Sequence, residues 1–468
     1  MKTQDQSTFD QFQSKRQSIE DRISAGKELR KKYPRILHGE YKPAADRTDP
    51  VTVLEEQAKS RLQELIPVRY ARMLTSPFAF LRGGAAIMAA DLAASGGDTG
   101  INVQACGDLH VANFGVFASA ERNLVFGIND FDETMPGPWE WDMKRLVTSI
   151  VASGRFLGAD KRLCAESVRA AVSSYRKRMK QYAFMGNMEL WYSTISENDI
   201  LNTLSPSARK GAEKIMGKAR QRSHMQVLSK LTDIIDEKYR MRENAPFIVR
   251  ESHTQSGRSI EEALGLLLES YFLSLADDRK KLLQNYRIVD VARKVVGVGS
   301  VGTRCWVIFL LGNHSDDPLF LQVKEAQPSV LEPFASKSIY ENQGHRVVEG
   351  QRLIQGAPDI FLGWGEQDGI HFYLRQLRDW KGGLEFDPRV VKVKNFPQYC
   401  SLCGWAMALA HAKSGDPAMI SGYIGNSNEL DKAMLKFALA YAEQNEKDFK
   451  ALKVAAKSGR IKVAAVKE

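Results

Sequence analysis

The chain has 468 residues, of which 43% are apolar, so it can bury more than one hydrophobic core of ordinary domain size. No stretch approaches the roughly 18 consecutive apolar residues that a membrane helix needs, and the polar first residues do not resemble a signal peptide. We therefore expect no membrane span and a cytoplasmic location. The net charge of +10 fits a nucleotide or a nucleic acid as partner, or simply a solvated helix face.

The cysteine pattern points to a reducing compartment. The five cysteines are odd in number and lie mostly in apolar segments. Cys400 and Cys403 form a single CxxC pair without a second pair or flanking histidines. We expect these two residues to pack on a helix rather than to hold a metal ion.

Changes in composition divide the chain into four segments. Residues 1–75 are polar and basic and are expected to form an arm with short helices. Residues 76–285 are predicted as a helical lobe, 286–385 as a β-rich lobe, and 386–468 as helices that pack on the helical lobe. The expected fold class is α+β with two lobes.

Within these segments the predicted elements follow a clear order. An Ala-rich helix, AAIMAADLAAS, precedes two short strands, INVQACGDLH and NLVFGINDFD, and a helix with apolar residues at helical spacing starts near Trp141. Later β-rich runs include TRCWVIFLLG and PLFLQVKEA, joined by GNHSDD as a hairpin turn. A helix through Arg346 and Ile354 precedes the strand HFYLRQL, and helices return after residue 395.

Acidic and amide side chains end both of the short strands. Asp108 and Asn113 follow the first strand, and Asp130 and Asp132 follow the second. Carboxylate and amide oxygens suit a Mg ion, and a free carboxylate near a substrate hydroxyl can accept its proton. Asp and Asn are also common turn residues, so two turns without chemistry are the competing interpretation.

A glycine-rich segment, Gly297-Val-Gly299-Ser300-Val-Gly302, lies between two predicted strands. In a dinucleotide-binding fold such glycines open a helix, whereas the residues that follow here are rich in β-formers and reach a hairpin turn. A strand-loop-strand flap over phosphates fits this order better. The motif alone is weak evidence, and a flexible hairpin is the alternative.

Lys324 lies on the strand after the hairpin turn. Its neighbours Leu321 and Val323 indicate a buried strand, where an unpaired lysine would be costly. An ammonium group there can reach phosphate oxygens. Glu349 on the following helix is its expected ion-pair partner, with Glu341 as the rival.

Together these residues resemble the protein-kinase-like superfamily, most closely its aminoglycoside phosphotransferase branch. CGDLHVAN matches the catalytic loop HGDLHxxN, NDFDE matches a metal-binding triplet, and the segment up to Asp142 resembles the one after that triplet, where an aspartate opens a helix. The resemblance implies ATP and Mg as cofactors. It also implies a catalytic base (Asp108), Mg ligands (Asn113, Asp130, Asp132), phosphate-binding residues (Gly297, Gly299, Ser300, Gly302, Lys324) and a backbone hinge for adenine (Gln376 to Arg378).

Longer strings, among them SPFAFLRG, VGVGSVGTRC and GWAMALAHAKSGD, resemble a bacterial family, domain of unknown function 2252 (DUF2252), over most of the chain. The catalytic loop precedes the flap, which is the reverse of the kinase-like order, so the resemblance implies a circularly permuted two-lobed kinase-like fold. Cys106 replaces the usual histidine, which would change how the loop is held. Either GWAMALAHAK or AAIMAADLAAS is the helix that leads into the catalytic loop in space.

The resemblance implies a phosphotransferase that moves phosphate from ATP to the hydroxyl of an unidentified small molecule or protein. Arg69, Arg72 and Arg82 are candidates to contact an anionic acceptor or to bridge the arm to the body. One alternative is a non-catalytic nucleotide-binding pseudokinase or scaffold. Another is a metal-dependent phosphoesterase using His110 and His314, although the eight histidines are scattered along the chain.

Overall fold

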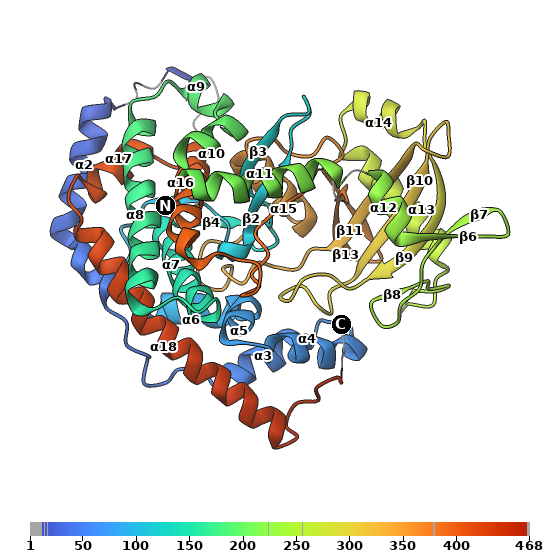
Figure 1. The fold of residues 1–468 in the computed structure, drawn as a ribbon, viewed down its shortest axis with the longest axis horizontal. Helices are drawn as coiled ribbons and strands as arrows, with labels where there is room; N and C mark the ends of the chain where they lie inside the picture. The colour runs from blue at the N-terminus through green and yellow to red at the C-terminus, as the bar shows by residue number, and fades with distance from the viewer. Residues whose placement is uncertain are drawn as a thin grey trace.

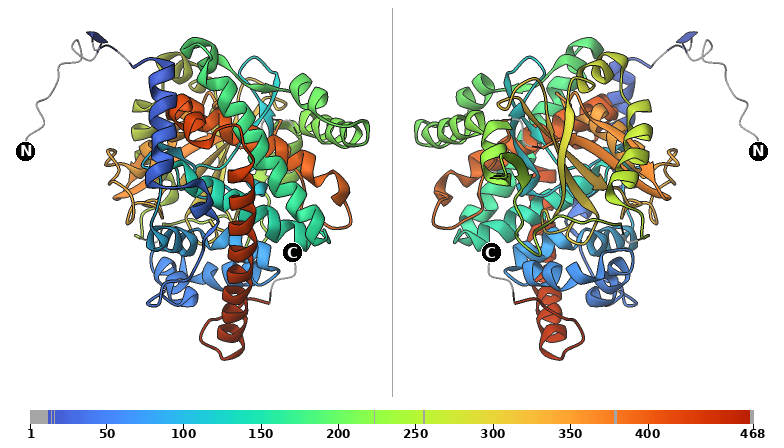
Figure 2. Two further views of the ribbon diagram at one scale, coloured as in Figure 1. Left: turned by 90° about the vertical axis from the view of Figure 1, so that its left-hand side faces the viewer. Right: turned by 90° about the vertical axis from the view of Figure 1, so that its right-hand side faces the viewer.

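A helical part and a six-stranded β-sheet lie side by side in the protein (Figure 1). The structure, a computed structural model, describes residues 17–465 except 223, 255, 378 and 379, and also residues 12, 13 and 15. Figure 2 shows the first long helix, α2, and the last one, α18, within the helical part, so both ends of the described chain contribute to it. This mixture of helices and antiparallel strands confirms the α+β class expected from the sequence.

The helical part is built around α7 (Trp139–Phe156), which is buried along nearly its whole length. Its apolar residues Met143, Leu146 and Val147 are 0% exposed, which confirms the predicted helical face. Among the described residues no single helix is long and apolar enough to cross a membrane; α5 and α6 reach that character only as a pair, which bends by 77°. The surrounding helices are α2 (Ile19–Lys32), α3 (Pro50–Ala58), α4 (Ile66–Met73), α5 (Pro77–Gly83), α6 (Ala85–Ser95), α8 (Lys161–Ala183), α16 (Phe396–Ser414), α17 (Pro417–Ile424) and α18 (Glu429–Lys457).

Two small antiparallel sheets carry the loops of interest. β1 (Asn102–Ala105) pairs with β4 (Met135–Pro138), and β2 (Phe114–Ala118) pairs with β3 (Leu124–Ile128). The short β5 (Ile195–Ser196) extends the second sheet beside β3. The acidic residues predicted at strand ends follow β1 and β3, so both strands point their ends toward the same region.

The large sheet is antiparallel, in the order β12-β13-β11-β10-β9-β8. The predicted hairpin joins β10 to β11, and the Gly312 N–H donates to the Asp317 carbonyl oxygen at 2.9 Å. The predicted helix between β11 and β12 is α15 (Gln343–Ile354), whose first turn is capped by the Asn342 side chain. The strands are β8 (Ile248–Val249), β9 (Arg287–Lys294), β10 (Cys305–Leu311), β11 (Pro318–Glu325), β12 (Gly363–Gln367) and β13 (Ile370–Gln376).

The segment 76–285, predicted as one helical lobe, is divided in the structure. Leu228 of α12 and Tyr271 of α13 lie in hydrophobic clusters with strands of the large sheet, not with the helical part. A hairpin and β8 also interrupt the predicted helices, because strands of two to four residues leave too short a pattern to recognise. The remaining elements are α9 (Asn187–Tyr192), α10 (Glu197–Thr203), α11 (Pro206–Gln221), α12 (His224–Leu231), β6 (Thr232–Ile235), β7 (Lys238–Met241), α13 (Ile260–Leu273) and α14 (Asp277–Leu283).

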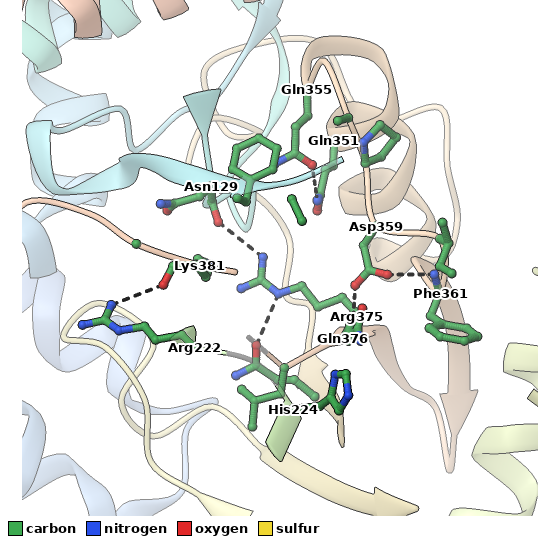
Figure 3. A pocket seen from close by; sticks show the side chains of 18 of the residues that line it. Asn129, Arg222, His224, Gln351, Gln355, Asp359, Phe361, Arg375, Gln376 and Lys381 are labelled. Atoms are coloured by element: carbon green, nitrogen blue, oxygen red, sulfur yellow. Dashed lines mark hydrogen bonds between the residues drawn. The ribbon is translucent and has the colours of Figure 1, made fainter. Parts of the chain in front are cut away.

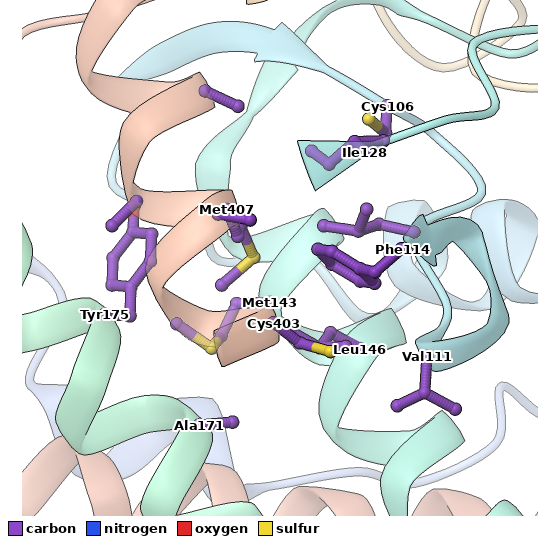
Figure 4. Close-up of a cluster of buried hydrophobic side chains, with 14 of the residues drawn as sticks. Cys106, Val111, Phe114, Ile128, Met143, Leu146, Ala171, Tyr175, Cys403 and Met407 are labelled. Atoms are coloured by element: carbon purple, nitrogen blue, oxygen red, sulfur yellow. The ribbon is translucent and has the colours of Figure 1, made fainter. Parts of the chain in front are cut away.

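The largest hydrophobic cluster packs directly against the loop after β1 (Figure 4). It brings Cys106 and Val111 of that loop together with Met143 of α7 and Met407 of α16. Cys400 and Cys403 on α16 are 0% exposed and, like the other cysteines, are not joined in a disulfide, which confirms their packing role. The loop after β1 is therefore part of the core and not a loose connection.

Candidate active site

A cavity of about 770 Å³ opens between the large sheet and the sheet formed by β2 and β3 (Figure 3). Of the residues singled out in the sequence, it is lined by Asp130, Gly297, Ser300, Lys324 and Gln376. They come from three distant parts of the chain: the end of β3, the glycine-rich loop and the large sheet. The volume lies within the range of known ligand sites.

The loop that carries Asp108 is held by a polar stripe on α7. Asp142, Arg145 and Ser149 are three and four residues apart, so they lie on one face of this helix. The Asp142 carboxylate accepts bonds of 2.7 and 3.0 Å from the two backbone N–H groups that precede Asp108. The Ser149 hydroxyl accepts a bond of 3.0 Å from the Val111 N–H. The stripe thus fixes the loop at three points.

Cys106 stands where the resembling family has a histidine, and it holds the loop through its backbone. Its thiol is buried in the core, and burial raises the pKa of that thiol well above its ordinary value. Asp142, which accepts the Cys106 N–H, lies 3.3 Å from His411 Nε2, and His411 Nδ1 lies 2.9 Å from the Tyr175 hydroxyl. A buried chain of polar groups from three helices therefore orients the carboxylate that anchors the loop.

Asp108 is bound through one carboxylate oxygen, and its side chain is 22% exposed. Arg145 Nε donates to Asp108 Oδ1 at 2.6 Å, and the Asn113 amide donates to the Asp108 carbonyl oxygen at 2.8 Å. Burial raises the pKa of the Asp108 carboxyl to about 7, against the lowering effect of Arg145. A carboxylate that titrates near neutral pH suits a general base. Among the predicted site residues Asp108 has the electrostatic setting expected for proton transfer.

The two aspartates of the triplet have different surroundings. Asp132 accepts bonds from Lys324 Nζ at 2.6 Å and from the Tyr373 hydroxyl. Burial alone would raise the pKa of the Asp132 carboxyl, but Lys324 and Tyr373 bring it below its ordinary value. Asp130 lines the cavity, and its Oδ1 is buried without a hydrogen-bond partner within the described part of the chain. Asp130 is therefore the carboxylate available to a ligand.

Lys324 is buried in β11, as predicted, but the predicted pair with Glu349 is wrong. Its side chain is 3% exposed, and its partner is Asp132. Glu349 instead lies 2.8 Å from Arg352 on its own helix, and Glu341 is exposed. A lysine buried this deeply needs a carboxylate within contact distance, and the strand end after β3 supplies it from the neighbouring sheet.

The glycine-rich loop approaches the loop of Asp108 closely. Gly297 and Gly302 have φ angles of 67° and 92°, a left-handed conformation that favours glycine. A Cβ atom at Gly299 would lie 3.0 Å from the Arg82 carbonyl oxygen and 4.0 Å from Asp108 Oδ2. Gly297 and Gly302 are therefore favoured by the backbone conformation at the ends of the loop. Gly299 is favoured by the close approach of neighbouring atoms at its middle.

Arginines of the N-terminal segment hold the glycine-rich loop. Arg61 donates to the carbonyl oxygens of Gly299 and Val301 at 2.7 and 2.6 Å, and Arg72 donates to that of Gly297 at 2.6 Å. Arg72 thus connects two parts of the chain, one of the roles predicted for it. No pattern in the sequence marks Arg61, because its partners are backbone carbonyls of a distant segment.

The candidate hinge is only partly described. The Gln376 N–H donates to the Asp359 carboxylate, and the Leu377 N–H donates to the Phe320 carbonyl oxygen at 2.8 Å. In this structure both N–H groups are therefore occupied and not available to an adenine ring. Arg378 lies outside the described residues.

Sequence reasoning missed Arg375, which projects into the middle of the cavity (Figure 3). Its guanidinium lies 3.3 Å from both Gln322 Oε1 and the Asn129 carbonyl oxygen. Burial alone would lower the pKa of this guanidinium, but Tyr373 and Asp130 raise it above its ordinary value. A charged residue inside the apolar run HFYLRQL is the signal that could have found it.

The donor atoms near Asp130 suit a Mg ion that arrives with a phosphate ligand. The described residues contain no group of three or more His, Cys, Asp or Glu side chains placed to hold a metal ion. Mg in phosphate sites needs only one or two carboxylates, because phosphates and waters complete its shell. Asp130 offers an oxygen that has no partner among the described residues. The backbone of Asn113 bonds to that of Asn129, the residue before Asp130, since the Asn129 N–H donates to the Asn113 carbonyl oxygen at 3.0 Å. Asp132, predicted as a third ligand, is occupied by Lys324.

Comparison with known proteins identifies a family but no characterised relative. The family model described as "Uncharacterized protein conserved in bacteria (DUF2252)" matches residues 61–455. No curated protein and no solved structure matches the chain. The matched range contains the loop of Asp108, the triplet, the glycine-rich loop and Lys324. The protein is thus a member of the DUF2252 family.

Proposed function

We propose that the protein is a cytoplasmic, ATP- and Mg-dependent phosphotransferase that acts on a hydroxyl acceptor. One observation carries the proposal: Asp130, Lys324 and the glycine-rich loop line the same cavity, although they come from distant parts of the chain. Lys324 is paired across 192 residues with Asp132 of the triplet. A carboxylate, a lysine and a glycine-rich loop around one cavity are the parts that phosphoryl transfer from ATP requires.

The order of elements in the large sheet supports a kinase-like nucleotide site. The glycine-rich loop joins β9 to β10, Lys324 follows on β11, and α15 precedes β12 and β13. A glycine-rich loop over phosphates with a lysine on the third strand is the protein-kinase arrangement. Glu349 departs from that pattern, because Asp132 takes its place beside Lys324.

The position of α16 supports circular permutation. The Ser414 hydroxyl at the end of α16 accepts a bond of 3.1 Å from the Gln104 N–H of β1. The helix that contains GWAMALAHAK therefore ends beside the strand that leads to Asp108, whereas α6 only precedes that strand in the sequence. Of the two helices considered, α16 better fits the helix before the catalytic loop.

In the proposed reaction, the acceptor oxygen forms a bond to the γ-phosphorus of ATP, the bond from that phosphorus to the bridging oxygen breaks, and ADP leaves. Asp108, oriented by Arg145, accepts the hydroxyl proton. Lys324 and the N–H groups of the glycine-rich loop hold phosphate oxygens. Asp130 and Asn113 would hold Mg, which supplies charge neutralisation at the phosphates.

Calorimetric titration of ATP and ADP, with and without Mg, tests the nucleotide site. We expect Mg-dependent binding to the wild type, weakened in both Asp130→Ala and Lys324→Ala. Arg162→Ala is the control and should bind like the wild type, because Arg162 pairs only with Glu166 on the exposed surface of α8 and does not line the cavity. A wild type that binds neither nucleotide refutes the proposal.

Asp108→Asn separates an enzyme from a nucleotide-binding scaffold. This variant keeps the size of the side chain but loses the proton acceptor, so it should bind ATP and fail to transfer labelled γ-phosphate to acceptors found in a screen. Transfer at the wild-type rate would exclude Asp108 as the base.

A further inference from the structure

The sequence singled out three arginines, Arg69, Arg72 and Arg82, and the first two have protein partners. Arg69 is 1% exposed and donates to the Gln57 side chain at 3.0 Å and to the Gly83 carbonyl oxygen at 3.2 Å. Arg72 donates to the Gly297 carbonyl oxygen at 2.6 Å. Both therefore have a structural role in the arm and the glycine-rich loop.

Arg82 differs from these two arginines. Within the described part of the chain it makes no hydrogen bond and no ion pair, whereas a buried Nε without an acceptor is a feature that it shares with Arg69. Its guanidinium carbon lies 6.0 Å from the centre of the Phe78 ring, which supports the side chain from its own helix, α5. A buried Nε without an acceptor is costly, and the two terminal nitrogens of Arg82, which make no bond within the described residues, can donate to a ligand.

The surroundings of Arg82 are the reaction centre. The Leu81 carbonyl oxygen, one residue earlier, accepts a bond of 2.8 Å from Arg145, which also binds Asp108. The nearest charged groups to Arg82 include the carboxylates of Asp108 and Asp130; burial lowers the pKa of the Arg82 guanidinium and these carboxylates oppose that effect. Neither carboxylate makes an ion pair with Arg82 within the described part of the chain, and of these three residues Asp130 lines the cavity.

The middle of the glycine-rich loop lies against the backbone of Arg82 and near the carboxylate of Asp108. Gly299 lies so close that a Cβ atom there would be 3.0 Å from the Arg82 carbonyl oxygen and 4.0 Å from Asp108 Oδ2. The contact at Arg82 is with its backbone, so Arg82 and Asp108 are both neighbours of a phosphate that this loop would hold.

We infer that Arg82 is a catalytic residue that binds the transferred phosphoryl group, a deepening that rests on the proposed phosphotransferase function. Its planar guanidinium donates N–H bonds to two γ-phosphate oxygens, on the side of that group facing Asp108. As the bond to the bridging oxygen breaks, Arg82 offsets the negative charge on the transferred group, the role that an arginine supplies in other phosphoryl-transfer sites.

Calorimetry with two nucleotides tests this assignment. An arginine that contacts only the terminal phosphate distinguishes Mg·AMP-PNP, which has that phosphate, from Mg·ADP, which lacks it. We expect Arg82→Ala and Arg82→Met to weaken AMP-PNP binding by about 10-fold or more and to change ADP binding by less than about 2-fold. Arg82→Lys should retain part of the AMP-PNP affinity, because a charge remains.

Arg72→Ala is the matched control from the same segment. It loosens the whole glycine-rich loop, so it should weaken both nucleotides to a similar degree. Equal losses for both nucleotides in the Arg82 variants, with thermal unfolding unchanged, would overturn the assignment. Unchanged binding of both nucleotides would also overturn it and would place Arg82 on the acceptor side. A wild type that binds neither nucleotide refutes the proposed function itself and this assignment with it.

Discussion

The two loops that meet at the site are held in different ways. The loop of Asp108 is anchored by side chains of α7 that belong to the core, and its main anchor, Asp142, is 1% exposed. The glycine-rich loop is anchored by long arginine side chains from a separate segment, and the bond from Arg72 is exposed. The base therefore cannot move without disturbing the main core. The glycine-rich loop depends on these arginines and on Val301, which is buried in a smaller hydrophobic cluster.

The largest expected effect concerns the ion pair between Asp132 and Lys324, which joins the strand end after β3 to the large sheet. Asp132→Ala leaves Lys324 buried without its carboxylate, which should lower the free energy of unfolding by about 3–5 kcal/mol. Glu349→Gln is the matched control and should stay within about 0.5 kcal/mol of the wild type, because Glu349 pairs with Arg352 near the surface. Urea unfolding measures both values. An equal loss of unfolding free energy in the two variants would contradict the assignment of Asp132 as the partner of Lys324.

Asp142→Ala tests whether the core holds the loop of Asp108. Two backbone N–H groups would lose their acceptor, which should lower the free energy of unfolding by about 2–3 kcal/mol. Urea unfolding is again the measurement. Asp142→Asn keeps one acceptor oxygen and should lie between alanine and the wild type. A fully stable alanine variant would show that the loop does not depend on α7.

Arg61→Ala tests the looser anchoring of the flap. Loss of two bonds to loop carbonyls should weaken Mg·ATP binding by about 10-fold, because the loop then samples other conformations. Arg155→Ala, which removes an ion pair with Glu446 on the helical part, is the control and should bind ATP normally. If ATP affinity is the same in Arg61→Ala and the wild type, the arginine does not set the position of the loop.

The last prediction is a pH dependence of the helical part. His38 lies 2.7 Å from the Tyr423 hydroxyl and packs against Trp139 at the start of α7. Burial lowers the pKa of His38 from 6.5 to about 3. Between these two pKa values the unfolded chain binds more protons than the folded chain. The contribution of neutral His38 to the free energy of unfolding is therefore fully present above about pH 6.5. It falls as the pH decreases, by at most about 1.4 kcal/mol per pH unit. Urea unfolding from pH 7 to pH 4 measures the slope, and His38→Gln should reduce it.

Local features of the site could be predicted from the sequence. The two strand ends, the hairpin turn, the buried strand of Lys324 and α15 all depend on residues close together in the chain, where apolar spacing and turn residues decide the structure. The close approach of the glycine-rich loop to Asp108 required, in addition, the resemblance to a known family. Short strands such as β8 were not predicted, because two residues are too few to show the alternation of apolar and polar side chains that indicates a strand.

The sequence by itself determined the family, the α+β class and the residue types of the site. Only the tertiary structure decided the partners: Asp132 instead of Glu349 for Lys324, backbone carbonyls for Arg61, and no hydrogen-bond acceptor among the described residues for Arg82. The physical reason is that hydrogen bonds and ion pairs depend on distances of a few ångströms between segments far apart in the chain. Spacing along a sequence specifies which face of an element a side chain occupies, and packing alone specifies what that face meets.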